Sequence, residues 1–158
     1  MDRPYNRIAC CIDEDGMADV VLREGIRLAG GALGTVSVVH VIAPPHALIA
    51  GSYGYIPPLV EPRGEAEAWL EEVTRGIPEA TKVLLEGFPP REVCAWARSS
   101  AVEVIVAAAH RGLVERAMLG GFASYIAYHA PCSVLLVHRP TERPATVGAT
   151  EGATGERS

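Results

Sequence analysis

The chain alternates between short apolar runs and longer stretches with helical periodicity. Five runs are almost continuously apolar, at residues 8–12, 36–41, 83–85, 104–107 and 134–137. Runs in which polar and apolar residues do not alternate are typical of strands covered on both faces, as in a parallel sheet. The pattern therefore predicts five buried strands.

Between the runs, apolar residues recur three or four positions apart, which is the spacing of one helix face. The first such stripe is Ala18, Val21, Leu22, Gly25, Ile26 and Ala29, and later stripes span residues 66–77, 93–101 and 122–130. Alternating strands and helices require parallel strands joined by right-handed crossovers. We therefore predict an α/β fold: a single doubly wound, five-stranded parallel sheet in the order 3-2-1-4-5, with helices on both faces.

Two segments fall outside this alternating unit. Residues 42–63 contain five prolines and two glycines, which predicts a surface loop. After His138 the chain is rich in Pro, Thr, Gly, Ala, Glu and Arg and lacks apolar anchors, which predicts disorder. We therefore expect one domain over residues 1–140 and a disordered C-terminal tail over residues 141–158.

Composition and charge argue against two classes of partner. The chain has 14 Lys and Arg against 19 Asp and Glu, a net charge of −5, without the clustered basic residues that capture nucleic acid or anionic membranes. No apolar run approaches the roughly 18 residues of a spanning helix. Residues 1–7 are polar and do not resemble a signal peptide. We expect a cytoplasmic protein that binds neither nucleic acid nor membrane.

The four cysteines show no metal-binding or redox spacing. Cys10 and Cys11 are adjacent on a predicted strand, so their side chains point to opposite faces. No C-x-x-C pair occurs, and the histidines have no ligand spacing. We expect four reduced, mostly buried thiols and no metal site.

A ligand site is expected at one edge of this sheet. In doubly wound folds, ligands bind outside the carboxyl ends of the strands, where the strand order reverses. With the predicted order, the reversal lies between the first and fourth strands. Glycines before a helix also offer backbone N–H groups to an anion. The first strand ends in Ile12-Asp13-Glu14-Asp15-Gly16. The fourth strand ends in Ala107-Ala108-Ala109-His110-Arg111-Gly112, and its loop continues to Leu119-Gly120-Gly121-Phe122, where the fourth helix begins.

Several short motifs have a familiar order and spacing. They are a first strand ending in aspartate at 7–13, V-H-V at 39–41, E-G-F-P at 86–89, V-I-V at 104–106 followed by L-G at 119–120, and H-A-P-C-S-V-L-L-V at 129–137. Over residues 5–139 the sequence resembles the universal stress protein family. The resemblance implies a stress-linked, regulatory homodimer rather than an enzyme.

The resemblance also implies roles for individual residues. In nucleotide-binding members, the aspartate after the first strand holds the ribose, and the end of the second strand meets the adenine through its backbone. The loop G-x-x-G-x9-G-[S/T] cradles the phosphates. By position, these roles fall to Asp13, Val41, Ala107, His110, Gly120 and Gly121, with Ile12, Arg111, Phe122 and Ala123 beside them.

The phosphate loop departs from the family pattern. Ala107 and His110 stand where glycines are expected, and Gly121 stands where a hydroxyl would meet phosphate. An alternative alignment through Gly112 shortens the spacer and does not restore the motif. Glycine at such turns serves positive φ or close backbone approach, so its loss predicts a degenerate loop.

Three functions are compatible with this pattern. The first is a non-enzymatic stress-response protein without a firm cofactor, which acts through a protein partner and dimerises through its apolar edge strand, Ser133–Val137. The alternative is a sensor of ATP or AMP, with Mg²⁺, that uses a rebuilt loop in which His110 and Arg111 supply positive charge. The third, a small hydrolase using Asp13 and His110, is least favoured because enzyme motifs are absent.

Two residues of the site have an alternative interpretation. Asp13 is either a ribose ligand or a cap of the first helix or turn. His110 is either an anion contact or a solvated loop histidine. By contrast, His40, at a strand end, and Trp69 and Trp96, on helical stripes, are expected to be packed core residues.

Overall fold

The structure, a computed structural model, describes residues 5–43, 62–109 and 121–139. Within these residues, five parallel strands form one sheet in the order β3-β2-β1-β4-β5, as predicted. The elements are β1 (Ile8–Cys11), α1 (Ala18–Ala29), η1 (Leu33–Thr35), β2 (Val36–Ile42), α2 (Arg63–Val73), β3 (Thr81–Glu86), α3 (Pro89–Ser99), β4 (Val104–Ala108), α4 (Gly121–His129) and β5 (Ser133–Val137). The predicted tail and most of the predicted 42–63 loop lie outside the described residues.

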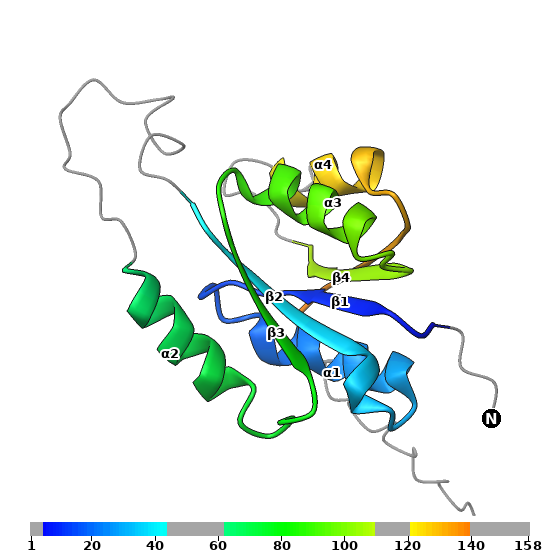
Figure 1. Cartoon of the computed structure of the whole chain (residues 1–158). Helices are drawn as coiled ribbons and strands as arrows, with labels where there is room; N and C mark the ends of the chain where they lie inside the picture. The colour runs from blue at the N-terminus through cyan, green and yellow to red at the C-terminus, as the bar shows by residue number, and fades with distance from the viewer. Residues whose placement is uncertain (1–4, 44–61, 110–120, 140–158) are drawn as a thin grey trace, which may run out of the picture.

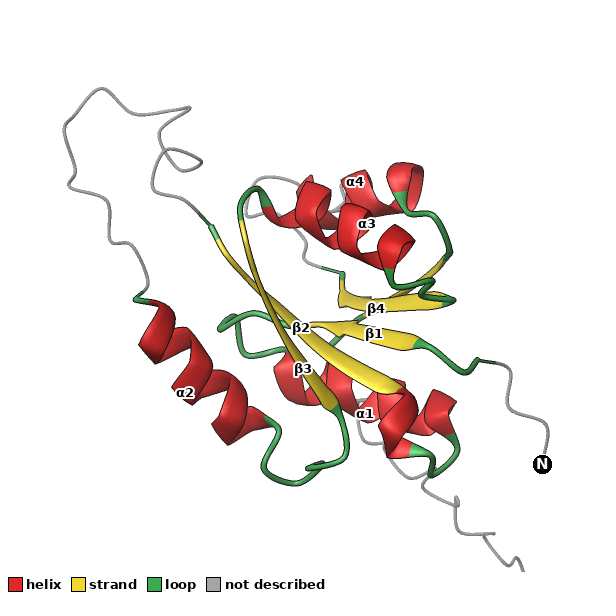
Figure 2. Ribbon diagram, viewed as in Figure 1, coloured by secondary structure: helices red, strands yellow, loops and turns green. Residues whose placement is uncertain are grey.

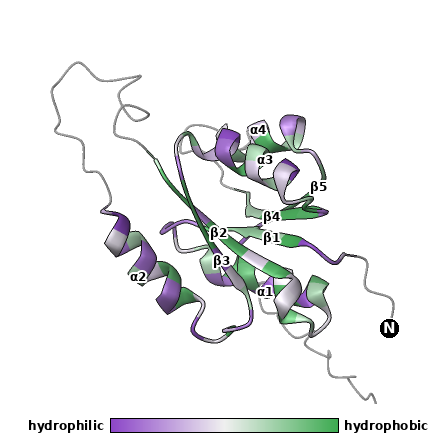
Figure 3. Ribbon diagram, viewed as in Figure 1, coloured by the Kyte–Doolittle hydropathy of each residue, from purple (hydrophilic) through white to green (hydrophobic). Residues whose placement is uncertain are grey.

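Helices cover both faces of the sheet, with α1 and α2 on one side and α3 and α4 on the other (Figures 1 and 2). Successive residues of β1 face opposite sides, so Cys10 packs in the core under α1 and Cys11 in the core under α3 and α4. β1 is therefore apolar on both faces, and the hydropathy colouring shows mostly hydrophobic residues along β1 and β4 (Figure 3).

The cysteines behave as expected from their spacing. All four are free thiols: Cys10, Cys11 and Cys94 are buried, and Cys132 is half-buried.

In the described parts of the chain, no helix has both the length and the apolar character needed to cross a bilayer.

The central strand ends earlier than its neighbours. Cys11, the last residue of β1, lies opposite Val39 of β2 and Ala107 of β4. β2 continues to Ile42 alongside β3, and β4 continues to Ala108 alongside β5. The shorter β1 leaves a notch between β2 and β4 at the carboxyl edge, which is where the strand order reverses.

Helix α2 is shorter than its apolar stripe suggests. The stripe predicts a helix through Ile77, but α2 ends at Val73. The hydroxyl of Thr74 donates to the carbonyl of Leu70 at 2.7 Å, and Ile77 lies in the following turn. Ile77 is nevertheless buried against the same core, so its apolar character reflects burial and not helical structure.

Helix α3 ends at Ser99, before the predicted position, in a turn that uses a left-handed residue. Ala101 has φ +50°, and its N–H donates to the carbonyl of Arg98 at 3.3 Å. The N–H of Val102 donates to the carbonyl of Ala97 at 2.9 Å. This pair of bonds is the Schellman arrangement, which usually places glycine at the left-handed position.

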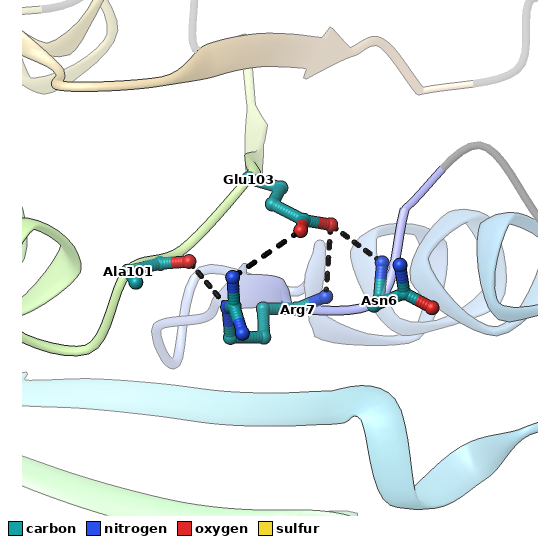
Figure 4. A network of polar contacts seen from close by, with 4 residues as sticks. All are labelled: Asn6, Arg7, Ala101 and Glu103. Carbon is teal, nitrogen blue, oxygen red and sulfur yellow. Dashed lines mark hydrogen bonds and ion pairs between the residues drawn. The ribbon is translucent and has the colours of Figure 1, made fainter.

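The turn is tied to the segment before β1, as Figure 4 shows. Arg7 Nε donates to the carbonyl of Ala101 at 2.6 Å, and the same guanidinium pairs with Glu103 at 3.4 Å. The backbone N–H of Asn6 donates to Glu103 at 2.6 Å, and this bond is the main reason that the pKa of Glu103 is lowered. The network links the turn after α3 to the segment before β1, at the end of the sheet opposite the notch.

Replacing Ala101 with glycine is expected to stabilise the fold. A non-glycine residue in the left-handed region costs about 1–2 kcal/mol, and glycine avoids this cost. Glycine in turn loses more backbone entropy on folding, which costs about 0.5–1 kcal/mol. We expect Ala101→Gly to raise the free energy of unfolding by about 0.5–1 kcal/mol. Urea unfolding with an unchanged m-value checks the prediction, and a lower midpoint would contradict it.

Candidate functional site

A cavity of about 520 Å³ lies at the notch above β1, and we call it the carboxyl-edge cavity. Its size falls within the ~300–1,000 Å³ typical of small-molecule sites. The ends of the three central strands form its floor, the start of α3 forms one wall, and the start of α4 contributes another. The lining residues are Cys11, Ile12, Asp13, Asp15, Val39, His40, Val41, Phe88, Pro89, Pro90, Val93, Ala108, Gly121 and Phe122.

The wall formed by the start of α3 has apolar side chains and no free backbone N–H groups. Its first two residues, Pro89 and Pro90, have no backbone N–H. The next two N–H groups, of Arg91 and Glu92, both donate to the carbonyl of Phe88 at 3.0 Å. The start of α3 therefore offers a ligand an apolar surface and not the anion-binding amides of an ordinary helix N-terminus.

The wall formed by α4 has the opposite character. Gly121 is the first residue of α4 and lines the cavity, with the ring of Phe122 beside it. The first N–H groups of a helix have no partner within the helix, and the dipole places partial positive charge there. An anionic group in the cavity is therefore best accommodated next to Gly121.

Asp13 provides an accessible carboxylate at the mouth of the cavity. Its side chain is 74% exposed, and its Oδ1 accepts a hydrogen bond from the N–H of Glu14 at 2.8 Å. It does not cap α1, whose N-cap residue is Met17. The carboxylate of Asp15 instead accepts the N–H of Met17 at 2.8 Å. Asp13 therefore does not cap the first helix, although its carboxylate accepts a backbone N–H of the following turn. The side chain remains accessible to a ligand.

His40 is a packed residue, as the sequence predicts, although it also reaches the cavity. It is 2% exposed, and its ring packs on Trp69 with 4.9 Å between centroids. Its Nδ1 lies 3.1 Å from the carbonyl oxygen of Ile12 and 4.0 Å from Oδ1 of Asp13. Because a carbonyl only accepts, Nδ1 carries the proton and donates to Ile12. His40 thus holds the segment that carries Asp13.

The thiol of Cys11 lines the cavity but remains protonated. Burial raises its pKa, and the nearby thiols of Cys10, Cys94 and Cys132 raise it further. A thiolate is the nucleophilic form of cysteine, so this group behaves as an apolar surface.

The charge of the described lining is negative. Asp13 and Asp15 contribute carboxylates, and none of the described lining residues is Lys or Arg. Asp13 and Asp15 form a negative rim of the cavity. Like charges at close range repel, so this rim opposes the binding of a ligand that carries several phosphates. Within residues 5–43, 62–109 and 121–139, no group of three or more His, Cys, Asp or Glu side chains could hold a metal ion.

The structure brings half of the predicted site residues together. Ile12, Asp13, Val41, Gly121 and Phe122 all line the cavity. Ala107 and Ala123 do not, because each is 1% exposed and packs in the core behind it. The other predicted residues, His110, Arg111 and Gly120, lie outside the described residues.

Sequence reasoning missed the α3 wall. Phe88, Pro89, Pro90 and Val93 were not among the predicted site residues, yet all line the cavity. A signal was available, because the E-G-F-P turn directly follows β3 at the carboxyl edge of the sheet. The contact itself depends on how α3 packs over β2, which the spacing along the chain does not show.

Comparison with known proteins agrees with this architecture. The model of the universal stress protein family matches residues 4–138. A search of curated proteins by sequence finds no match. Since the family model covers most of the chain, the match does not depend on one motif.

Three solved structures show the same fold. Universal stress protein UspA from Lactobacillus plantarum is 17% identical, with a TM-score of 0.61, and the match covers 86% of this chain and 99% of that one. A universal stress protein in complex with cAMP is 16% identical, with a TM-score of 0.63 and coverage of 85% and 97%. An Arabidopsis thaliana family member with AMP bound is 14% identical, with a TM-score of 0.60 and coverage of 89% and 97%.

Proposed function

Because the chain belongs to the universal stress protein family, we propose that it is a non-enzymatic regulatory protein that binds the nucleoside part of an adenine nucleotide. The supporting observation is the carboxyl-edge cavity, in which an apolar lining meets the accessible carboxylate of Asp13. Two structures with this fold carry cAMP and AMP. An adenine nucleoside matches the lining because its base is flat and weakly polar and its ribose hydroxyls donate to a carboxylate.

The two walls suggest an orientation for this ligand. The base faces the apolar side, formed by Val41, Phe88 and Pro89. The ribose lies at Asp13, and the phosphate lies toward Gly121, where α4 offers backbone N–H groups. In this orientation each part of the nucleotide meets a surface of matching polarity.

The same arrangement disfavours a triphosphate. The rim carries Asp13 and Asp15, and the predicted phosphate loop lacks two glycines and a hydroxyl of the family pattern. One lost hydrogen bond to a charged group weakens binding by about 1.5–3 kcal/mol, and every ~1.4 kcal/mol is tenfold in affinity. When Mg²⁺ accompanies the nucleotide, it neutralises part of the phosphate charge.

Titration calorimetry of the full chain tests the proposed function. We expect AMP and cAMP to bind more tightly than ATP, and ATP to bind no more tightly than about 100 μM, with or without Mg²⁺. The absence of binding by all three nucleotides would contradict the proposed function. Low-micromolar ATP binding would contradict the weak phosphate contact while leaving the nucleoside site intact.

Two residues of the cavity support a role without catalysis. The thiol of Cys11 has a raised pKa because it is buried, which opposes its use as a nucleophile. The Nδ1 of His40 donates to the carbonyl of Ile12, and its ring packs on Trp69. In this proposal the protein acts in the cytoplasm and responds to nucleotide levels by contacting a protein partner.

Release of phosphate from ATP over time would contradict the proposed role without catalysis.

Dimerisation through β5 forms part of the proposal. Ser133–Val137 is an edge strand, and its central residues are half-buried and apolar. An apolar edge pairs readily with a second copy across a two-fold axis. Light scattering at micromolar concentration should give twice the chain mass of 16.8 kDa. Val134→Lys should give monomers, and thermal melting should show that they are folded, because Val134 also packs against the core under α3 and α4. Ala127→Lys, at an exposed position of α4, should stay dimeric. A monomeric unmodified protein would contradict the prediction.

A further inference from the structure

Phe88 lies at the mouth of the cavity and is 51% exposed, although it is a large aromatic residue. It is also the N-cap residue of α3, where Ser, Thr, Asp or Asn is usual. A capping side chain is less needed here, because Pro89 and Pro90 remove two of the four N–H groups that lack a partner at the start of a helix, and the N–H of Arg91 donates to the carbonyl of Phe88. The position is therefore available to a side chain whose role is contact with a ligand.

Other aromatic residues hold the ring of Phe88 in place. Tyr125 of α4 packs on it with 6.3 Å between ring centroids and an angle of 90°. Tyr125 in turn packs on His129, one helical turn further along α4, at 4.3 Å. We call Phe88, Tyr125 and His129 the aromatic row. Because Tyr125 meets Phe88 at a right angle, it leaves at least one face of the Phe88 ring uncovered.

We propose that Phe88 is a specificity-determining residue that stacks on the base of a bound purine. This inference rests on the proposed function and specifies its ligand class. A flat bicyclic base gains more from an exposed aromatic face than a pyrimidine does, because it covers more of the ring. The negative rim limits the contribution of phosphate, so the base supplies most of the affinity.

The aromatic row makes this contact effective because the ring is ordered before the ligand arrives. A side chain that must be immobilised on binding loses part of its contact energy as entropy. Phe88 has few torsions, and Tyr125 already restricts it from the side of α4. Stacking of one base on an aromatic side chain, measured by alanine substitution, corresponds to roughly a 5- to 150-fold change in affinity.

The test compares AMP with UMP on the full chain by titration calorimetry. The unmodified protein should bind AMP more tightly than UMP. Phe88→Leu, which keeps an apolar side chain but removes the flat face, should weaken AMP binding roughly 5- to 150-fold and bring the two affinities together. Phe88→Tyr should retain both the affinity and the preference.

Tyr128→Leu is the matched control. Tyr128 is an aromatic residue of α4 that is 86% exposed and does not line the cavity, so its loss should leave AMP binding unchanged. Thermal melting of each variant shows whether it folds. Phe88→Tyr and the ratio of AMP to UMP affinity in the unmodified protein test the inference even if Phe88→Leu is unstable.

The outcomes separate this inference from the proposed function. If the unmodified protein binds AMP and Phe88→Leu binds it equally well, the stacking role is wrong and the nucleoside site stands. Equal affinities for AMP and UMP in the unmodified protein would also overturn the stacking role. If the unmodified protein binds none of AMP, cAMP and ATP, the proposed function and the inference both fail.

Discussion

Gly25→Ala is expected to lower the melting temperature of the protein by about 4–8 °C. A Cβ atom at Gly25 would lie 2.1 Å from Sγ of Cys10, which is fully buried on β1. Overpacking of a core costs about 1–3 kcal/mol, occasionally more, and alanine returns about 1 kcal/mol in helix propensity. At so short a distance we expect a net loss of about 2 kcal/mol in the free energy of unfolding.

A second substitution tests whether the contact with Cys10 causes the loss of stability in Gly25→Ala. Cys10→Ala removes Sγ and leaves the new Cβ 3.9 Å from Cys10 Cβ and from Ile8 Cγ2, which are ordinary contacts. The double variant should therefore melt well above Gly25→Ala alone, with a coupling energy that a double-mutant cycle measures. Gly64→Ala is the control, because a Cβ on this glycine of α2 meets no atom within 4 Å. If Gly25→Ala melts like the unmodified protein, the close contact is wrong.

Asp13→Ala is expected to weaken the binding of adenosine and AMP by about 10- to 150-fold. The reason is the loss of a charge-assisted hydrogen bond from the ribose, which contributes roughly 1.5–3 kcal/mol. Adenosine is the more informative ligand, because it carries no phosphate and its affinity is insensitive to the negative rim. The side chain of Asp13 is 74% exposed, so the substitution should leave the melting temperature nearly unchanged.

Glu14→Ala is the matched control for Asp13→Ala. Glu14 is the next residue, carries the same charge and does not line the cavity. Its loss should leave adenosine binding unchanged, and Asp13→Asn should give an intermediate affinity because it keeps an oxygen acceptor without the charge. Equal weakening by Asp13→Ala and Glu14→Ala would show a general charge effect and would contradict a ribose contact at Asp13.

Most of the fold follows from local patterns in the sequence. Strands covered on both faces must be apolar throughout, so runs such as 8–12 and 104–107 indicate a parallel sheet before any contact is known. Alternation with helical stripes then determines the doubly wound topology, and the topology indicates the edge where a ligand binds. Asp13 was predicted at the cavity by this reasoning, and the structure places it there.

The predicted phosphate loop illustrates a limit of the same reasoning. The substitutions at His110 and Gly121 predict weak phosphate binding, but residues 110–120 lie outside the described part of the chain. The degenerate loop therefore stays a prediction that depends on the nucleotide titrations. The end of α2 shows a related limit, because Ile77 follows the helical stripe but is buried in a turn.

The sequence by itself determined the class of fold, the strand order and the edge that carries the site, because each depends on periodicity and on residues close together in the chain. Tertiary structure alone decided which distant residues meet. Gly25 appears in the sequence as one member of a helical stripe, and only its contact with Cys10 explains why the position needs glycine. Phe88 becomes a candidate ligand contact because α3 and α4 pack together and bring Tyr125 to its ring. Such contacts arise from the packing of whole elements, which local spacing does not encode.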